Sequence, residues 1–126
     1  MIIIKITMNV IPGKQLEMMQ TLISMIEPTV KQTVKQTGCI SYSIFCDIED
    51  KNRFCLLEEW KTREELDQHI ASRQFSILLG TKALCREPPD IQIHTVSHSE
   101  GMDAIHVARG KNATLFPNDE KWRPVK

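Results

Sequence analysis

The sequence lacks an excess of charge of either sign. Sixteen lysine and arginine residues balance sixteen aspartate and glutamate residues in a chain of 126 residues. A chain without net charge has no general field that would draw it toward phosphate backbones or anionic lipids. Nucleic acid and membrane surfaces are therefore poor expectations for its binding partners.

Long apolar runs and paired cysteines are missing as well. The apolar start MIIIKITMNV is interrupted by Lys5 and Asn9, which is typical of a strand and not of a signal peptide. No stretch approaches the roughly twenty apolar residues that a membrane-spanning helix needs. The four cysteines form no CxxC pair. These absences predict a cytoplasmic protein whose cysteines are reduced and serve as small buried hydrophobic residues.

Hydrophobic periodicity predicts the order β, α, β, β, α, β along the first 96 residues. Period-two segments predict strands and three- or four-residue steps predict helices, over the ranges 2–10, 14–38, 39–60 (a hairpin), 62–84 and 91–96. This order is the split βαβ arrangement of ferredoxin-like domains. We therefore expect an α+β fold in which helices cover one face of a four-stranded antiparallel sheet.

The predicted hairpin also suggests a cross-strand register. If its turn is centred on the polar segment IEDKN, Tyr42 lies opposite Glu58 on one face, and Ile40 lies opposite Trp60. We expect the sheet face that the helices leave open to carry Tyr42, Leu56 and Trp60. So large an apolar area is rarely left exposed to water. A second copy of the chain is its simplest cover, which predicts a homodimer.

The sequence changes character after the last predicted strand. From residue 98 onward glycine, asparagine, proline and charged residues are frequent, with one strand-like stretch at 104–108. Such a segment suits draping over a partner chain better than forming an independent fold. We expect a domain at residues 1–97 and a C-terminal arm at 98–126 that packs on the partner subunit.

Glu58 is the strongest candidate for a catalytic group. Strand alternation separates it from its neighbour Glu59, which we expect to be solvated. Between apolar surfaces, desolvation would disfavour the charged form of Glu58, and this suits a base that takes a proton from a phenol or an activated carbon. The structural alternative is an ion pair between Glu58 and a lysine or arginine across the sheet.

Four further side chains have a functional interpretation, and three of them also have a structural one. His69 could exchange a hydrogen bond with a substrate oxygen, or bond a backbone carbonyl at the border of its helix's apolar stripe. Trp60 could be a flat wall for an aromatic ligand, or core. Tyr42 could bond a substrate hydroxyl. Asn9 could orient a carbonyl or peroxide oxygen, or bond the turn that follows its strand.

Several motifs together resemble one known family. They are the Pro-Gly after the first strand, the segment GCISY, and Glu58-x-Trp60 followed by a polar helix start and His69. This pattern resembles the antibiotic biosynthesis monooxygenase family over roughly residues 2–97. The resemblance implies a dimer whose two sheets form a shared α+β barrel. It also implies oxidation of anthrones, quinols or similar aromatics by molecular oxygen without metal or flavin.

The resemblance also implies roles for individual residues. Glu58 or His69 would remove a phenolic proton, and Asn9 would steady the oxygen atoms. The residues expected to bind the aromatic ring are Tyr42, Leu56, Trp60 and Phe75. The haem-degrading branch of the family has a tryptophan where this chain has His69, and its iron-ligating histidine has no counterpart in FSILLG. The expected activity is therefore a cofactor-independent monooxygenase.

Two alternatives from other functional classes remain open. A cofactor-independent isomerase of a small oxygenated metabolite would use Glu58 and His69 as an acid–base pair. It would need a phosphate-binding cation near the cavity, with the candidates Arg53, Arg73 and Arg86. A non-catalytic dimeric binding protein would keep an apolar pocket, with Glu58 held in a structural ion pair.

Overall fold

The chain forms two compact units, Met1–Val96 and Ser97–Lys126. The structure, a computed structural model, describes residues 1–36 and 38–110. Among these residues no helix is both long enough and apolar enough to cross a membrane.

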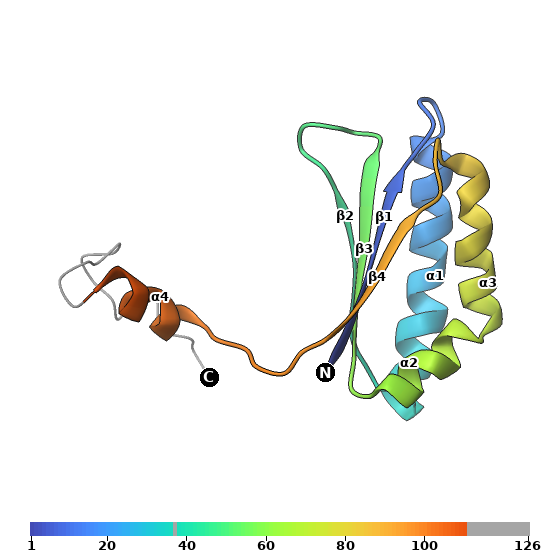
Figure 1. The fold of residues 1–126 in the computed structure, drawn as a ribbon. Coiled ribbons are helices and arrows are strands. Elements are labelled where there is room, and N and C mark those ends of the chain that lie inside the picture. The colour runs from blue at the N-terminus through green and yellow to red at the C-terminus, as the bar shows by residue number, and fades with distance from the viewer. Residues whose placement is uncertain (37, 111–126) are drawn as a thin grey trace. The chain divides into compact units, whose positions relative to one another are not determined.

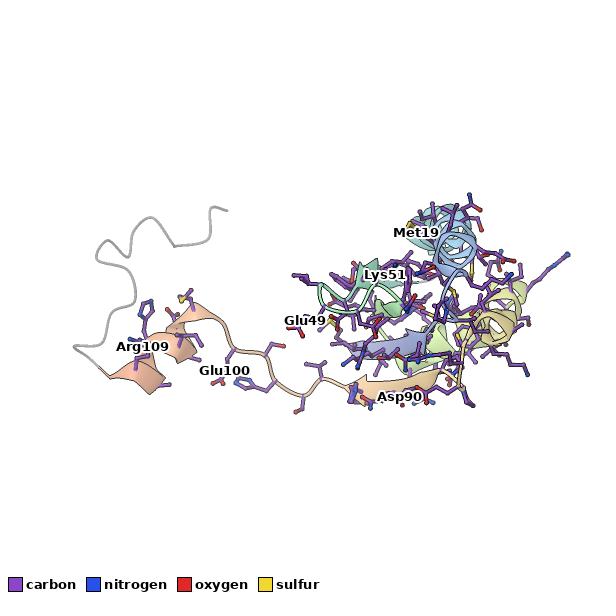
Figure 2. The ribbon with its side chains drawn as sticks, turned by 90° about the horizontal axis from the view of Figure 1, so that it is seen from above. Met19, Glu49, Lys51, Asp90, Glu100 and Arg109 are labelled. Carbon is purple, nitrogen blue, oxygen red and sulfur yellow. The ribbon has the colours of Figure 1, made fainter. Side chains whose placement is uncertain are left out.

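The first unit is an antiparallel sheet covered on one face by helices (Figure 1). The strands, in the spatial order β2-β3-β1-β4, are β1 (Ile2–Asn9), β2 (Cys39–Cys46), β3 (Arg53–Trp60) and β4 (Asp90–Thr95). The helices are α1 (Gln15–Gln36), α2 (Arg63–Ile70), α3 (Arg73–Gly80) and the 3-10 turn η1 (Thr81–Leu84). In Figure 2 Asp90 marks the edge strand β4, and Lys51 lies in the turn that joins β2 to β3. The predicted ferredoxin-like α+β fold is confirmed.

The hydrophobic core lies between the sheet and the helices. On β1 every second side chain is buried, and these residues pair with Phe54, Leu56, Glu58 and Trp60 on β3. Directly opposed residues share a sheet face. The helices contribute the buried residues Met18, Leu22, Met25, Leu66, Phe75 and Leu78.

The expected contents of the two sheet faces were wrong. Tyr42, Leu56 and Trp60 face the helices and belong to the core or pack against it. The alternation of β3 shows which residues share a face but not which face the helices cover. The buried residues of β1 settle that question. The other face carries residues that are half-buried or exposed, namely Ile3, Lys5, Thr7, Ser41, Ser43, Phe45, Cys55, Leu57 and Glu59.

The predicted hairpin register is confirmed for one pair and wrong for the other. Tyr42 pairs with Glu58 as expected, whereas Trp60 pairs with Cys39 and not with Ile40. The register shifts between Cys39 and Ser41, and Ile40 is half exposed. Such a bulge leaves one residue unpaired and re-aims its neighbours. Simple counting from the turn cannot reveal it.

Side-chain caps fix where the two short helices begin. The Oγ1 of Thr62 accepts a hydrogen bond from the backbone N–H of Glu65 at 3.2 Å and so caps the start of α2. Ser72 caps α3 in the same way through the N–H of Phe75. Because α2 begins so soon after Trp60 ends β3, the helix folds back over that end of the sheet.

The expected strand at residues 104–108 was also wrong. This stretch lies within helix α4 (Met102–Arg109) of the second unit. Asp103 in the first turn and Arg109 in the last turn carry the charges that complement a helix dipole. Gly110 follows with φ 86°, a backbone region that favours glycine. These end signals were present in the sequence and outweigh the β-branched residues between them.

Gly38, between α1 and β2, is predicted to lose about as much stability as Gly13 on replacement by alanine. Both glycines have positive φ, 70° and 91°, so alanine costs about 1–2 kcal/mol of backbone strain at either position. A Cβ at position 38 would meet the carboxyl group of Glu65, but this is the end of a flexible side chain that can rotate away, and at Gly13 a Cβ would meet no described atom within 4 Å. Urea denaturation should therefore show similar losses of unfolding free energy for Gly38→Ala and Gly13→Ala. A clearly larger loss for Gly38→Ala would contradict the ability of Glu65 to move aside.

Candidate functional site

A fully buried carboxylate stands in the middle of the core. Glu58 has an exposed fraction of 0%. On its sheet face it lies between Ile4 of β1 and Tyr42 of β2, and the next residue along β3 on that face, Leu56, is also fully buried. Burying a carboxylate in such surroundings is costly unless hydrogen bonds and charges compensate it. The contacts of Glu58 therefore determine what this part of the core can do.

One carboxylate oxygen of Glu58 holds two nitrogen partners. Its Oε1 accepts a hydrogen bond from the indole N–H of Trp60, with Nε1 at 3.0 Å, and the His69 Nε2 lies 3.2 Å away. Trp60 reaches Glu58 because residues two apart on a strand share a face. The structural alternative expected a lysine or arginine beside Glu58, whereas the basic side chain that contacts its carboxylate is His69.

The His69 side chain packs against the core at its border. Its ring stacks on that of Trp60, with centroids 4.7 Å apart and planes inclined by 29°. The ring of Phe75 approaches it edge-on at 5.6 Å. Only 8% of the His69 side chain is exposed. Two aromatic rings therefore fix the imidazole in the plane from which it reaches Glu58.

The second carboxylate oxygen and a neighbouring phenol lack partners. Glu58 Oε2 and the Tyr42 hydroxyl are both buried, and neither has a hydrogen-bond partner among the described residues. Burial raises the pKa of Tyr42 well above its ordinary value, and the charges of Glu58 and then of Cys39 raise it further. The phenol is therefore protonated at neutral pH and available as a donor.

The residues expected to bind an aromatic ring belong to the hydrophobic core that contains Glu58 or pack against it. Leu56 and Trp60 are fully buried and Phe75 is 4% exposed. Trp60 therefore acts as a hydrogen-bond donor and a stacking surface for His69 more directly than as an exposed wall. Sequence reasoning missed this donor role, because the Glu58-x-Trp60 spacing places both side chains on one strand face but does not specify the orientation of the indole N–H.

The structure does not bring Asn9 to this site. Met8 and Val10 are buried on the Glu58 face, so the alternation of β1 places Asn9 on the other face. Its Nδ2 donates to Glu87 Oε1 at 2.6 Å. The sequence contained the alternation but gave no sign of Glu87 as a partner. The expected role of Asn9 beside Glu58 has no geometric basis.

The candidate phosphate-binding arginines are exposed, unlike Glu58, and the described residues form no metal-ligand cluster. Arg53, Arg73 and Arg86, the candidate phosphate ligands, are all exposed, and Arg53 lies at the opposite end of β3 from Trp60. Within residues 1–36 and 38–110 no group of three or more histidine, cysteine or acidic side chains is arranged to hold a metal ion.

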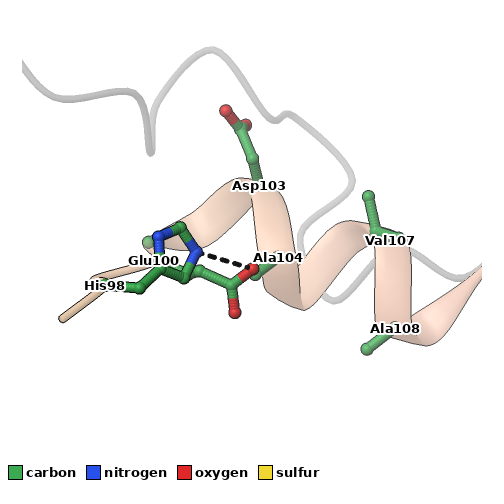
Figure 3. Close-up of a pocket in the computed structure, with 7 residues that line it drawn as sticks. His98, Glu100, Asp103, Ala104, Val107 and Ala108 are labelled. Atoms are coloured by element: carbon green, nitrogen blue, oxygen red, sulfur yellow. Dashed lines mark ion pairs between the residues drawn. The ribbon is translucent and has the colours of Figure 1, made fainter.

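A separate hollow lies beside α4 in the second unit (Figure 3). His98 Nε2 and Glu100 Oε1 approach to 3.5 Å there, with side chains 74% and 65% exposed. An ion pair so open to water contributes little stability. The lining residues are His98, Glu100, Gly101, Asp103, Ala104, Val107 and Ala108. None of them is buried, so this hollow is open to water, unlike the surroundings of Glu58.

Comparison with known proteins identifies the family. The sequence model of antibiotic biosynthesis monooxygenases matches residues 1–76. This match covers more than half of the chain, so the chain belongs to the antibiotic biosynthesis monooxygenase family. Membership indicates a monooxygenase-like or related small-molecule-binding role.

Individual relatives agree on the fold. An uncharacterized protein of Synechocystis is 28% identical over 100 residues, which cover 79% of this chain and 65% of that protein. The chain therefore spans about two thirds of the length of this relative. A conserved protein of Methanosarcina mazei is similar in structure, with 29% identity, a TM-score of 0.60, and coverage of 74% and 89% of the two chains. A protein of Mycobacterium tuberculosis shares 19% identity with a TM-score of 0.68 and coverage of 79% and 98%.

The Trp60–Glu58 hydrogen bond should contribute measurably to stability. A buried hydrogen bond to a charged group contributes about 1.5–3 kcal/mol. In a double-mutant cycle, Trp60→Phe should therefore lose more unfolding free energy in the wild-type background than beside Glu58→Met, where no acceptor remains. Replacing the indole by a smaller phenyl ring costs the same free energy beside Glu58 and in the Glu58→Met background, so the difference between the two backgrounds isolates the hydrogen bond. A coupling free energy near zero in urea denaturation would contradict the assigned bond.

Proposed function

We propose that the protein is a cofactor-independent monooxygenase that oxidises a small aromatic quinol or anthrone-like substrate with molecular oxygen. The observation that carries the proposal is the buried Glu58 carboxylate, with Oε1 held by two nitrogen partners and Oε2 unpartnered. A carboxylate fixed in this way within apolar surroundings is suited to proton transfer. Family membership supplies the class of reaction.

The proposed reaction begins with removal of a proton from a ring hydroxyl. Glu58 accepts this proton, and His69 stabilises the pair by holding Oε1. The resulting electron-rich anion reduces oxygen. For a hydroquinone with a free ring C–H, one oxygen atom becomes a ring hydroxyl and the other leaves as water. The substrate loses four electrons and ends as a hydroxyquinone, which balances the four electrons that O2 accepts.

The non-catalytic binding alternative is supported by one specific observation. Glu58 Oε1 is engaged by Trp60 and His69, as a purely structural buried ion pair would be. The isomerase alternative gains no such support, because its candidate phosphate-binding arginines are exposed. Asn9 takes no part in any of these schemes, since it lies on the other sheet face.

Oxygen uptake with a panel of hydroquinones and anthrones tests the proposal. Glu58→Gln should lower the rate by about 10²-fold or more, because a lost general base typically costs that much. His69→Ala should also lower the rate of oxygen uptake. Glu59→Gln is the matched control, since that carboxylate bonds Ser41 on the other face of β3. If wild type turns over and neither Glu58→Gln nor His69→Ala reduces the rate, the assigned roles are refuted. If wild type binds these compounds without oxygen uptake, the result favours a non-catalytic binding protein.

We further propose that the protein is a cytoplasmic homodimer. Its open sheet face combines half-buried Leu57 with Phe45, whose side chain is 52% exposed, so apolar area is available for a second copy. The C-terminal arm would pack on the partner subunit. Its helix α4 contributes the exposed Ile105 and Val107, whereas residues 111–126 lie outside the described part of the chain.

Sedimentation velocity at micromolar concentration should show a dimer for the wild type. Leu57→Lys should give a monomer, because it would bury a charge on the open face. Ile48→Lys, at a fully exposed position in the β2–β3 turn, is the matched control and should remain dimeric. A monomeric wild type would contradict the proposed dimer.

A further inference from the structure

Two unpartnered polar atoms belong to neighbouring residues on the same face of the sheet. Tyr42 and Glu58 are directly opposed on the antiparallel strands β2 and β3. Residues in this relation have Cβ atoms about 4.5–5.5 Å apart. The Tyr42 hydroxyl and Glu58 Oε2 are both buried without a partner among the described residues. Buried polar atoms are normally satisfied, so two orphans at one place indicate a third polar group that joins them.

The chemistry of the two atoms defines that third group. An ionised carboxylate oxygen can only accept a hydrogen bond, and a protonated phenol can donate one. A group that serves both must donate and accept through one atom. A hydroxyl does so, whereas a ketone can accept from Tyr42 but cannot donate to Glu58. An ether has the same deficiency as a ketone.

The surroundings define the rest of the ligand. Ile4, Leu56 and Ile44 flank the pair on the same sheet face and favour an apolar body. Every lysine and arginine whose burial the structure describes is exposed, and none of these cations compensates a second negative charge beside Glu58. An anionic ligand would therefore be repelled. Tyr42 lies on the edge strand β2 and is itself half-buried, which gives a ligand a side from which to approach.

We propose that Tyr42 and Glu58 Oε2 together bind one hydroxyl of an uncharged aromatic substrate, and that this pair selects the hydroxyl form over a ketone. This rests on the proposed function and narrows its substrate class from quinols or anthrones to compounds that present a ring hydroxyl. The hydroxyl that Tyr42 orients is the one whose proton Glu58 accepts. Tyr42 is thus a substrate-binding residue that determines specificity.

Three probes of similar size test the hydroxyl requirement. They are 1-naphthol, 1-tetralone and naphthalene, which offer a hydroxyl, a ketone and no polar group. Ligand-detected NMR titrations of the full chain under nitrogen should show 1-naphthol binding at least about tenfold more tightly than 1-tetralone, because the ketone leaves Oε2 unpaired. Equal affinities, or no binding of 1-naphthol at millimolar concentration, would overturn the proposal.

The variant Tyr42→Phe tests the second half of the pair. It should weaken 1-naphthol binding about three- to tenfold and leave naphthalene binding unchanged. Ser43→Ala, on the other face of the same strand, is the control and should change neither. The melting temperature of Tyr42→Phe should be equal to or above that of wild type, since an unpartnered hydroxyl is removed. A lower melting temperature together with unchanged 1-naphthol affinity would make the hydroxyl structural and overturn the proposal.

The two proposals fail in different ways. Selective 1-naphthol binding without oxygen uptake from any hydroquinone would refute the oxygenase while supporting the hydroxyl site. Oxygen uptake that depends on Glu58, with no effect of Tyr42→Phe on 1-naphthol binding, would refute the hydroxyl site and leave the oxygenase intact.

Discussion

The burial of the Glu58 carboxylate is the constraint on which the site depends. A negative charge in an apolar core is stable only where fixed donors replace the lost water. Trp60 and His69 supply this replacement at a single oxygen, Oε1. The two carboxylate oxygens are therefore chemically different, one with its partners in the chain and the other buried without a partner among the described residues. That asymmetry distinguishes a potential catalytic base from an ordinary buried ion pair.

The fold produces this arrangement through a short connection. Trp60 is the last residue of β3, and Thr62 already caps α2. The helix consequently turns back over the sheet and places His69 on the indole ring of Trp60. The cap of α3 at Ser72 then brings Phe75 to the other side of the imidazole. Three consecutive elements thus position one histidine, and each depends on local sequence signals that are separate from the chemistry they serve.

Much of the fold followed from sequence pattern, because period-two and helical spacing, capping residues and glycines act locally. The sequence also placed Tyr42 opposite Glu58. Three features escaped it. The bulge between Cys39 and Ser41 shifts the pairing of Trp60, and simple counting cannot detect an unpaired residue. The face covered by helices depends on tertiary packing. The helix at Met102–Arg109 has β-branched residues inside it, so its end charges and Gly110 carried the better signal.

The sequence predicted which residues form the candidate site better than it predicted what each of them does. Glu58, His69 and Tyr42 do come together, because strand alternation and the β3–α2 connection leave little freedom. Asn9 does not join them, since one residue of alternation places it on the other face. Trp60 has a donor role that depends on the orientation of its indole N–H, and no spacing rule specifies that orientation.

A crystal structure of the full chain, grown without oxygen in the presence of 1,4-naphthohydroquinone, tests the central claim most directly. The account predicts one ring hydroxyl between Glu58 Oε2 and the Tyr42 hydroxyl, with Oε1 still bonded to Trp60 and His69. A hydroquinone bound elsewhere, with a water molecule or a protein group joining Glu58 Oε2 and Tyr42, would contradict it.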